Sequence, residues 1–390
     1  MIRTLFDYQA FELQRIGGVS RSYAELISHL DRVSGCECQL GLRESDNVYL
    51  KECGLSNHIK PLHYTHDRLF KGKKLFKGQR TITRKILGLL GYRHDGYTVN
   101  QDFCIKLLNR QSFDIFEPTF LDAYFLPYLK GKPFVLTVHD MIPELYPQFF
   151  AEDDYQIRMK RLLCPLAAQI HVPSNKTKED LTHILGIHPE KVTVIYHGAP
   201  KLVEHEIRQE RLFDFPYLLY VGDRFGYKNF QPWLKVVSKI VKDYPDIHVV
   251  CTGKPFNDVE RRFVTDLQLE NHIDYFFASQ DTFGNLYQNA IAFVFPSDYE
   301  GFGLPILEAF AYGCPVMLND ASCFPEVGGD AALFFSMKGE SSDFYDKFQE
   351  LYSMSSSDRA DLIEKGRKRV RQFSWESSAL KLKEVYSRVL

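Results

Sequence analysis

The sequence predicts an α/β fold made of two doubly wound domains, each built on a parallel sheet. The chain has 390 residues, more than one hydrophobic core usually serves, and its 45% hydrophobic content is enough for two cores. Short apolar runs alternate along it with amphipathic helical stretches, which is typical of parallel sheets covered by helices. Such domains leave a cleft at the carboxyl ends of their strands, where ligands bind.

The expected elements fall on either side of a charged segment. We expect strands in the first half at Ile2–Phe6, Phe134–Val138, Gln169–Val172 and Val192–Tyr196. We expect strands in the second half at Tyr217–Val221, His248–Thr252, Ile273–Phe277, Ala292–Phe295 and Pro315–Leu318. Residues 201–211 are highly charged and are expected to link a first domain, 1–200, to a second, 212–373. Ser374 is a good N-cap for a final helix.

Composition excludes several classes of protein. The formal net charge of −2 and the pI near 6.7 give no overall attraction to nucleic acid, so no nucleic-acid partner is expected. The start of the chain does not resemble a signal peptide, and no 18-residue apolar run is present. The eight cysteines are scattered without metal-type pairing, which indicates reduced thiols. We therefore expect a cytoplasmic protein.

The most informative motif is Tyr299-Glu300-Gly301-Phe302-Gly303-Leu304-Pro305-Ile306-Leu307-Glu308. It follows an apolar run, and Pro305 suits the first turn of a helix, so a strand is expected to lead into a helix through a glycine turn. Unpaired amides at such a helix start, together with its dipole, suit a diphosphate. The two glutamates on either side would accept hydrogen bonds from hydroxyl groups, although acids at this spacing also occur on solvated helix surfaces.

The run YEGFGLPILEAFAYGCPV resembles the retaining glycosyltransferases of family 4, which have the two-domain GT-B fold and a Glu-x7-Glu donor motif. The resemblance implies that Glu300 contacts the transferred sugar as a catalytic residue and that Glu308 contacts the ribose. It assigns donor contacts to the amides of Gly301, Phe302, Gly303 and Leu304. It also implies that the last helix, 374–390, crosses back onto the first domain.

A second cluster, Gly222-Asp223-Arg224-Phe225-Gly226-Tyr227-Lys228-Asn229, follows the expected strand at Tyr217–Val221. A fixed cation there would stabilise the charge that develops on a leaving diphosphate. We expect Lys228 to be catalytic and to bind the donor, with Arg224 as a second donor-binding cation. A surface turn with solvated cations is the alternative. Similar loops in the family support Lys228 better than Arg224.

Another glycine turn, at Gly17 and Gly18, precedes the apolar-periodic segment from Tyr23 to Leu30. A pair of glycines is often only a turn. The family has a similar loop that reaches across the cleft toward the donor phosphates or the acceptor, and this resemblance assigns Gly17 and Gly18 to donor binding. Arg21 either shares that role or is a helix-surface charge.

His139 and Asp140 end an expected buried strand, so they point into the cleft. The resemblance makes His139 a catalytic residue near the transferred sugar, although a histidine at such a place is often structural. Asp140 either orients the imidazole or caps the next helix. Glu117 departs from the family, which commonly has histidine there. The segment Ser174-Asn175-Lys176-Thr177 should begin a helix, with capping or substrate contact as its role.

The sequence contains no Asp-x-Asp motif for a divalent ion. Lysine, arginine and helix dipoles would supply the positive charge, so we expect no metal and no cofactor.

Residues 68–94 contain nine Lys or Arg and no acid, interleaved with Leu, Ile and Phe. Such a segment can dock on anionic lipid, which favours peripheral contact with the inner face of the cell membrane. Binding of nucleic acid is the competing interpretation. A third is that the segment is a loop with no binding role, because its glycines interrupt a helix.

The sequence texture, including FDYQAFELQRIGGVSRSYAEL and VGDRFGYKNF, resembles the family branch of bacterial lipopolysaccharide and capsule assembly. It implies transfer of a hexose with retention, with mannose from GDP-mannose as the expected donor and a glycan or lipid-linked oligosaccharide as acceptor. The alternatives are a UDP-sugar-dependent glucosyl or N-acetylhexosaminyl transferase, a phosphorylase or epimerase of the same fold, and a non-catalytic sugar-nucleotide-binding protein.

Overall fold

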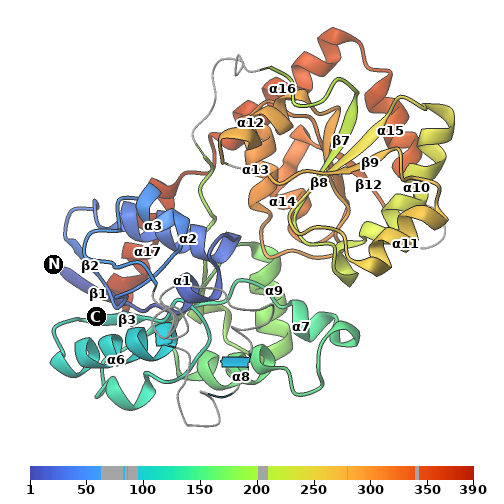
Figure 1. Cartoon of the computed structure of the whole chain (residues 1–390). Helices are drawn as coiled ribbons and strands as arrows, with labels where there is room; N and C mark the ends of the chain where they lie inside the picture. Colours follow the sequence, from blue (N-terminus) through green and yellow to red (C-terminus); the bar gives the residue numbers. More distant parts are fainter. Residues whose placement is uncertain (63–81, 84–85, 87–94, 201–209, 279, 339–341) are drawn as a thin grey trace.

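The computed structural model describes residues 1–62, 82–83, 86, 95–200, 210–278, 280–338 and 342–390. The predicted membrane segment 68–94 therefore lies almost entirely outside the described residues, and so do residues 201–209 of the predicted linker 201–211. Figure 1 shows two lobes, with the first half of the chain in one and residues from about 210 to 370 in the other. The bounds predicted for the two domains stay a prediction.

The first domain contains two three-stranded parallel sheets in the orders β2-β1-β3 and β4-β5-β6. A parallel bridge between Phe116 and Phe134 joins β3 to β4, so the strands form one continuous surface. The strands are β1 (Ile2–Phe6), β2 (Cys36–Leu40), β3 (Ile115–Glu117), β4 (Val135–Thr137), β5 (Gln169–Val172) and β6 (Val192–Val194).

Helices surround these strands. They are α1 (Gln9–Leu13), α2 (Gly18–Leu30), α3 (Val48–Glu52), α6 (Asp95–Arg110), α7 (Ile142–Leu145), α8 (Tyr155–Leu166) and α9 (Asn175–Leu185), with the 3-10 turns η1 (Leu126–Tyr128), η2 (Pro147–Phe149) and η3 (Pro189–Lys191). Ser174 caps α9, since its hydroxyl accepts from the amide of Thr177 at 3.1 Å. The predicted capping role is therefore present.

The second domain has one six-stranded parallel sheet in the order β12-β11-β10-β7-β8-β9. This is a doubly wound order, and its direction reverses between β7 and β10, which is where such sheets bind ligands. The strands are β7 (Tyr217–Val221), β8 (His248–Thr252), β9 (Ile273–Tyr275), β10 (Ala292–Phe295), β11 (Val316–Asn319) and β12 (Leu333–Phe335). The reversal brings together the loops that carry Lys228 and Glu300.

The helices of this domain are α10 (Phe230–Asp243), α11 (Asp258–Asp266), α12 (Gln280–Asn289), α13 (Leu304–Ala311), α14 (Phe324–Gly328), α15 (Phe344–Tyr352) and α16 (Ser356–Val370), with η4 (Gly226–Lys228) and η5 (Gly329–Ala331). Helix α10 shows why they form: Phe230, Trp233, Leu234 and Val237 recur at helical spacing and are all buried. Two apolar clusters, which include Leu219 and Leu218 respectively, build the core around the sheet.

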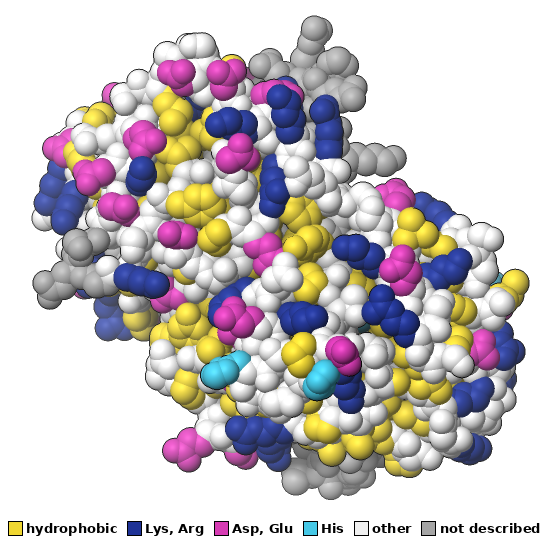
Figure 2. All heavy atoms as spheres, turned by 180° about the vertical axis from the view of Figure 1, so that it is seen from behind, with side chains coloured by type: hydrophobic (Ala, Val, Ile, Leu, Met, Phe, Trp, Pro, Cys, Tyr) yellow, Lys and Arg dark blue, Asp and Glu magenta, His cyan; other side chains and the backbone are white. Residues whose placement is uncertain are grey.

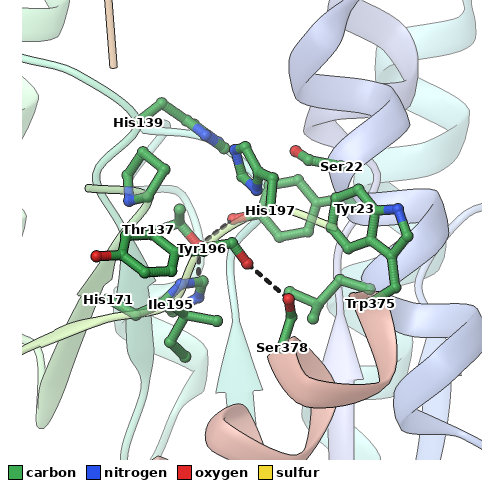
Figure 3. Close-up of a pocket in the computed structure, with 12 residues that line it drawn as sticks. Ser22, Tyr23, Thr137, His139, His171, Ile195, Tyr196, His197, Trp375 and Ser378 are labelled. Carbon is green, nitrogen blue, oxygen red and sulfur yellow. Dashed lines mark hydrogen bonds between the residues drawn. The ribbon is translucent and has the colours of Figure 1, made fainter. Parts of the chain in front are cut away.

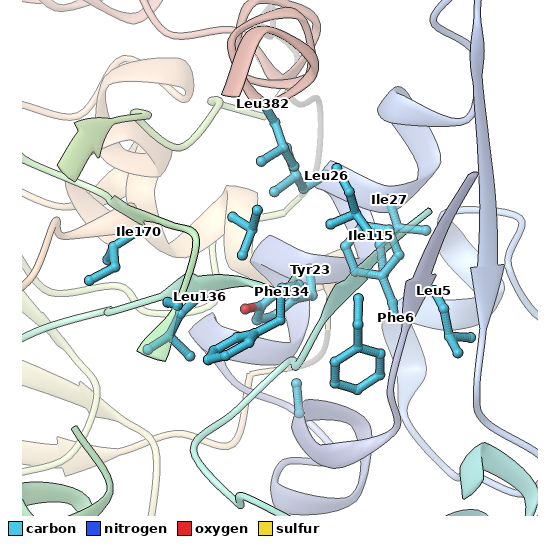
Figure 4. Packing of buried hydrophobic residues seen from close by; sticks show 14 of the residues in the cluster. Leu5, Phe6, Tyr23, Leu26, Ile27, Ile115, Phe134, Leu136, Ile170 and Leu382 are labelled. Atoms are coloured by element: carbon cyan, nitrogen blue, oxygen red, sulfur yellow. The ribbon is translucent and has the colours of Figure 1, made fainter. Parts of the chain in front are cut away.

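The last helix, α17 (Trp375–Val389), returns to the first domain, as predicted. It packs against α2, and Figure 1 shows it beside β1 with both chain ends nearby. Its buried side chains, including Ala379 and Leu382, belong to the same cluster as Leu5 and Phe6 of β1. Figure 4 shows Leu382 facing Leu26 of α2 within that core. The chain therefore has the GT-B architecture.

On the face shown in Figure 2, basic and acidic side chains are interspersed over both lobes. All eight cysteines are free thiols. No helix among the described residues is long and apolar enough to cross a membrane.

Candidate active site

The glycine turn before α13 has the form that the sequence predicts. Gly303 is the N-cap residue with φ of +94°, a left-handed conformation that favours glycine, and Pro305 lies in the first turn. The N-cap makes no side-chain hydrogen bond, so the first amides of α13 are free of a side-chain cap. They form a helix start suited to an anion.

Lys228 and Glu300 lie together beside this turn. The Lys228 ammonium donates to Glu300 Oε1, and the two side chains are only 15% and 13% exposed. The backbone of Glu300 is held as well, because its carbonyl accepts from the Ser322 hydroxyl at 2.8 Å. The structure thus places a cation and a carboxylate in contact at the reversal of the sheet order.

Glu308 is held from both domains. Its Oε1 accepts from the Arg21 guanidinium of α2, and its Oε2 accepts from the Tyr287 hydroxyl at 3.0 Å. Burial, followed by the charge of Glu308, raises the pKa of Tyr287 well above its usual value, so this hydroxyl stays a donor. Arg21 therefore joins the site by an ion pair across the cleft.

Gly18 begins α2 opposite α13. A Cβ added to Gly18 would lie 3.9 Å from the Leu304 side chain, so the two helix starts approach each other across the cleft. Gly17 has extended backbone, and a Cβ there would meet the Gln14 side chain at 2.4 Å. Gly18 thus lies within contact distance of the second domain, whereas Gly17 makes room for Gln14 of its own domain, and the donor-binding role of both glycines stays a prediction.

His139 lies against the same turn from the first domain. A Cβ built on Gly301 would be 1.9 Å from the His139 carbonyl oxygen, so only glycine fits at position 301. Burial lowers the pKa of the His139 imidazole to about 4, which keeps the ring neutral near pH 7. Asp140 lies just before the N-cap residue Met141 of the next helix, and its Oδ1 accepts from the Ile142 amide at 3.0 Å.

Arg224 does not join Lys228 and Glu300 through any contact among the described residues. Its Nε donates to Glu260 at 2.8 Å, and its guanidinium lies 4.6 Å from the centre of the Phe256 ring. The side chain is 3% exposed. The loop after β7 therefore directs this cation toward Glu260 of α11, and its donor-binding role stays a prediction.

A cavity of about 860 Å³ lies between the domains, with Arg21, Tyr287 and Glu308 in its lining. This size falls within the range of small-molecule sites. Sequence reasoning missed Tyr287, and it missed His197, whose ring lies 5.1 Å from Phe302 of the turn and 6.4 Å from His139. Neither residue has a spacing that pairs it with the motif.

Among the described residues, no group of three His, Cys, Asp or Glu is placed to hold a metal ion. The expectation of a metal-independent enzyme stays a prediction.

Two family models match the chain. The model described as "Glycosyltransferase Family 4" covers residues 16–201, and that described as "Glycosyl transferases group 1" covers residues 203–369. The fold and the cleft together define a glycosyltransferase of the GT-B type. The chain belongs to glycosyltransferase family 4.

Curated relatives match in part. "O-antigen chain mannosyltransferase RfbU" of Salmonella typhimurium is 27% identical over 220 residues, 56% of this chain and 60% of that protein. "O-antigen chain mannosyltransferase B" of Escherichia coli is 33% identical over 166 residues, 41% of this chain and 43% of that protein. The chain thus matches roughly half the length of these relatives.

Solved structures match over the whole chain. A sucrose-phosphate synthase from Thermosynechococcus elongatus has a TM-score of 0.72 at 16% identity, covering 100% of this chain and 99% of that one. Anabaena HepE, solved with UDP-glucose, has a TM-score of 0.71 at 16% identity, covering 100% of both chains. At this identity the likeness concerns the fold, and it confirms the predicted GT-B architecture.

Proposed function

We propose that this chain is a retaining glycosyltransferase that moves mannose from GDP-mannose to a glycan or lipid-linked oligosaccharide during surface polysaccharide synthesis. The observation that carries the proposal is the contact between Lys228 and Glu300 beside the start of α13. This contact supports the proposal because it lies at the point where a doubly wound sheet binds ligands. The two mannosyltransferase relatives support the choice of sugar and pathway.

The diphosphate would bind the free amides from Gly301 to Leu304. Lys228 would then exchange Glu300 for the leaving diphosphate, whose negative charge grows as the sugar bond breaks. We propose that this ammonium and the helix start supply the positive charge without a metal ion.

The two glutamates would bind the hydroxyl groups on either side of the diphosphate. Glu300 would accept from the transferred sugar, and Glu308 from the ribose once Arg21 leaves its Oε1. Neutral His139, next to Gly301, would offer a polar contact near the reacting carbon.

The anomeric configuration of the sugar is retained if the acceptor attacks from the same face that the diphosphate leaves. The bond from the anomeric carbon to the phosphate oxygen breaks, the bond to the acceptor oxygen forms, and the departing phosphate takes the acceptor proton. No protein nucleophile is required in this sequence of events.

A thermal-shift comparison of GDP, UDP and ADP with their sugars tests the donor. A ligand that binds only the folded state at about 100 times its Kd adds roughly 2.7 kcal/mol to the free energy of unfolding. We expect GDP and GDP-mannose to raise the melting temperature most. A larger shift with UDP would favour the second candidate, a UDP-sugar transferase, which the complex of Anabaena HepE with UDP-glucose suggests.

Proton NMR of the product then tests the stereochemistry. From the α-linked GDP-mannose we expect an α-mannoside. A β-mannoside would refute retention, and no release of nucleotide with any donor would favour the non-catalytic alternative.

We further propose that the segment 68–94 docks this enzyme on the inner face of the cell membrane. Vesicles with anionic lipid should bind the wild type but not a variant with Lys71, Lys73, Lys74 and Lys77 changed to glutamine, because each basic residue contributes about 1 kcal/mol near such a surface. Neutralising the exposed Lys235, Lys239, Lys242 and Lys254 is the matched control. Equal binding by both variants would refute the proposal.

A further inference from the structure

Glu117 is a fully buried carboxylate at the end of β3, at the position where the sequence departs from the family. Its side chain is 0% exposed. Oε2 accepts from the Tyr386 hydroxyl of α17, while Oε1 accepts from His171 Nε2 at 3.0 Å and from the Thr137 hydroxyl at 3.4 Å. A buried polar group is costly unless it is hydrogen-bonded, and these contacts give both carboxylate oxygens a partner.

The hydrogen bonds continue from Glu117 toward the cleft. The Thr137 hydroxyl lies 2.7 Å from His171 Nε2 and accepts from the Tyr23 hydroxyl at 2.7 Å. Figure 3 shows Thr137 between Tyr23 and His171. Burial raises the pKa of Tyr23 and of Tyr386 well above the usual value, so both hydroxyls remain donors. With the His171 proton on Nε2, the side chains of Tyr386, His171 and Thr137 all donate to Glu117. The Tyr23 hydroxyl donates to Thr137 or to the Pro118 carbonyl, which lies 3.2 Å away.

The series of hydrogen bonds from Glu117 ends at Tyr23, which packs against His139. The Tyr23 ring meets the His139 ring edge to face, with centroids 5.7 Å apart and planes at 81°, a favoured arrangement of aromatic rings. Thr137 ends β4, two residues before His139. The hydrogen bonds to Thr137 therefore hold the end of this strand, in addition to the Tyr23 ring beside His139.

The space beside His139 is small. A cavity of about 10 Å³ is lined by Tyr23, Thr137, His139 and His171, among other residues (Figure 3). That volume holds about one water molecule, so it does not take a sugar. His139 Nε2 is buried, with no hydrogen-bond partner among the described residues. This side of His139 therefore has no room for a sugar, and the ring packs there against Tyr23.

We propose that Glu117 and His171, acting through Thr137 and Tyr23, are positioning residues that hold the His139 ring for its contact with the donor sugar. The inference rests on the function proposed above. It links α17, the last element of the chain, to a ring at the cleft. A displacement of about 1 Å at such a ring can lower turnover by about a hundredfold.

Two single-oxygen deletions test this chain of contacts. Tyr23→Phe removes the hydrogen bonds to Thr137 and to the Pro118 carbonyl but keeps the ring that packs on His139. Ser378→Ala is the matched control, because Ser378 is also buried and lines the same cavity, but its hydroxyl bonds only to the carbonyls of Tyr196 and Ser374 among the described residues. We expect Tyr23→Phe to lower kcat by about tenfold with the donor KM within about twofold, while Ser378→Ala retains kcat.

A conservative pair at position 171 separates positioning from folding. His171→Gln keeps an N–H donor for Glu117, whereas His171→Leu removes it. We expect near wild-type kcat for the glutamine variant and a loss of about tenfold for the leucine variant. The melting temperature of every variant shows whether it is folded.

NMR of ¹⁵N-histidine-labelled full-length protein gives a readout that needs no donor. The His139 signals, assigned with His139→Asn, should shift in Tyr23→Phe and His171→Leu but not in Ser378→Ala. An unchanged kcat in Tyr23→Phe overturns the proposal, as does an equal loss in Ser378→Ala. If the wild type turns over no sugar nucleotide, the proposed function fails, and unchanged His139 signals would then overturn the positioning chain separately.

Discussion

The carbonyl oxygen of His139 occupies the place where a side chain of Gly301 would begin, since a Cβ built there lies 1.9 Å away. The strand end of one domain and the glycine turn of the other are therefore in backbone contact. Thr177 adds to this contact, because its hydroxyl donates to the Gly301 carbonyl at 3.4 Å. The closed cleft requires glycine at this position.

Gly301→Ala should prevent this contact. The added methyl must push the two backbones apart, so we expect turnover to fall by more than about tenfold and the free energy of unfolding to fall by about 1–3 kcal/mol. Steady-state kinetics and urea unfolding measure both. Gly131→Ala is the control: it strains a left-handed residue with φ of +86°, but the new Cβ meets no atom within 4 Å. A Gly301→Ala variant with wild-type kcat would contradict the closeness of the contact.

Lys228→Ala should remove the cation that meets the leaving diphosphate. The loss of one such electrostatic group typically costs about 10²–10³ in kcat. Rates of nucleotide release measure the effect, with Lys239→Ala on the exposed side of α10 as the control. If Lys228→Ala kept more than about a third of wild-type kcat, Lys228 would not have this role.

Arg21→Gln should strengthen nucleotide binding, because Arg21 occupies the Glu308 oxygen that a ribose hydroxyl would use. The two side chains are 24% and 15% exposed, and a pair of this kind is worth about 0.2–1 kcal/mol, or roughly 1.4-fold to fivefold in Kd. Calorimetry with GDP measures the change. Arg32→Gln, in the turn just after α2 and in the same cavity lining, should leave Kd unaltered. Weaker binding in Arg21→Gln would instead show that Arg21 contacts the nucleotide.

Acid should destabilise the folded chain through two buried histidines. Burial lowers the pKa of His139 to about 4 and that of His197 to about 3, whereas an unfolded histidine titrates near 6.5. Between these values the unfolded state binds protons that the folded state does not, so stability falls as the pH falls below about 6.5. Each group adds a slope of up to about 1.4 kcal/mol per pH unit.

Urea unfolding at about pH 7 and about pH 5 measures this slope. The variant His197→Asn should show a smaller difference between the two pH values than the wild type does. An equal difference would mean that His197 does not contribute.

Chelation should leave transfer intact. If Lys228 and the α13 start supply the positive charge, activity in excess EDTA should stay within about twofold of the untreated rate. Restoration of a lost rate by added Mg²⁺ or Mn²⁺ would refute this expectation.

Local sequence patterns predicted most of the fold. The bounds of β1, β5, β7, β8 and β10 are as predicted. Strands β7 and β10 consist only of apolar residues, which sets them apart from the polar loops that follow them. Strand β2 was not predicted because apolar and polar residues alternate along Cys36–Leu40 and the strand is only partly buried. The short β12 was also missed.

Contacts between site residues could be predicted from the sequence only where the order of the strands in the sheet brings their loops together. Lys228 and Glu300 lie 72 positions apart, but β7 and β10 are neighbours in a doubly wound sheet, so their loops meet. The pairing of Arg21 with Glu308, 287 positions apart, depends on how the domains face each other, which no local pattern contains. The ion pair between Arg224 and Glu260 likewise depends on where α11 lies.

The return of α17 to the first domain sets an order of events during synthesis. The core of the first domain is completed by four residues of α17, Trp375, Ala379, Leu382 and Tyr386. The other buried residues of this core, from Leu5 to Ile195, are made much earlier. Helix α17 must therefore leave the ribosome before the first domain can close, whereas all the strands and helices of the second domain have been made by then. Domains generally fold in the order in which they are made, and here the last-made domain should finish first.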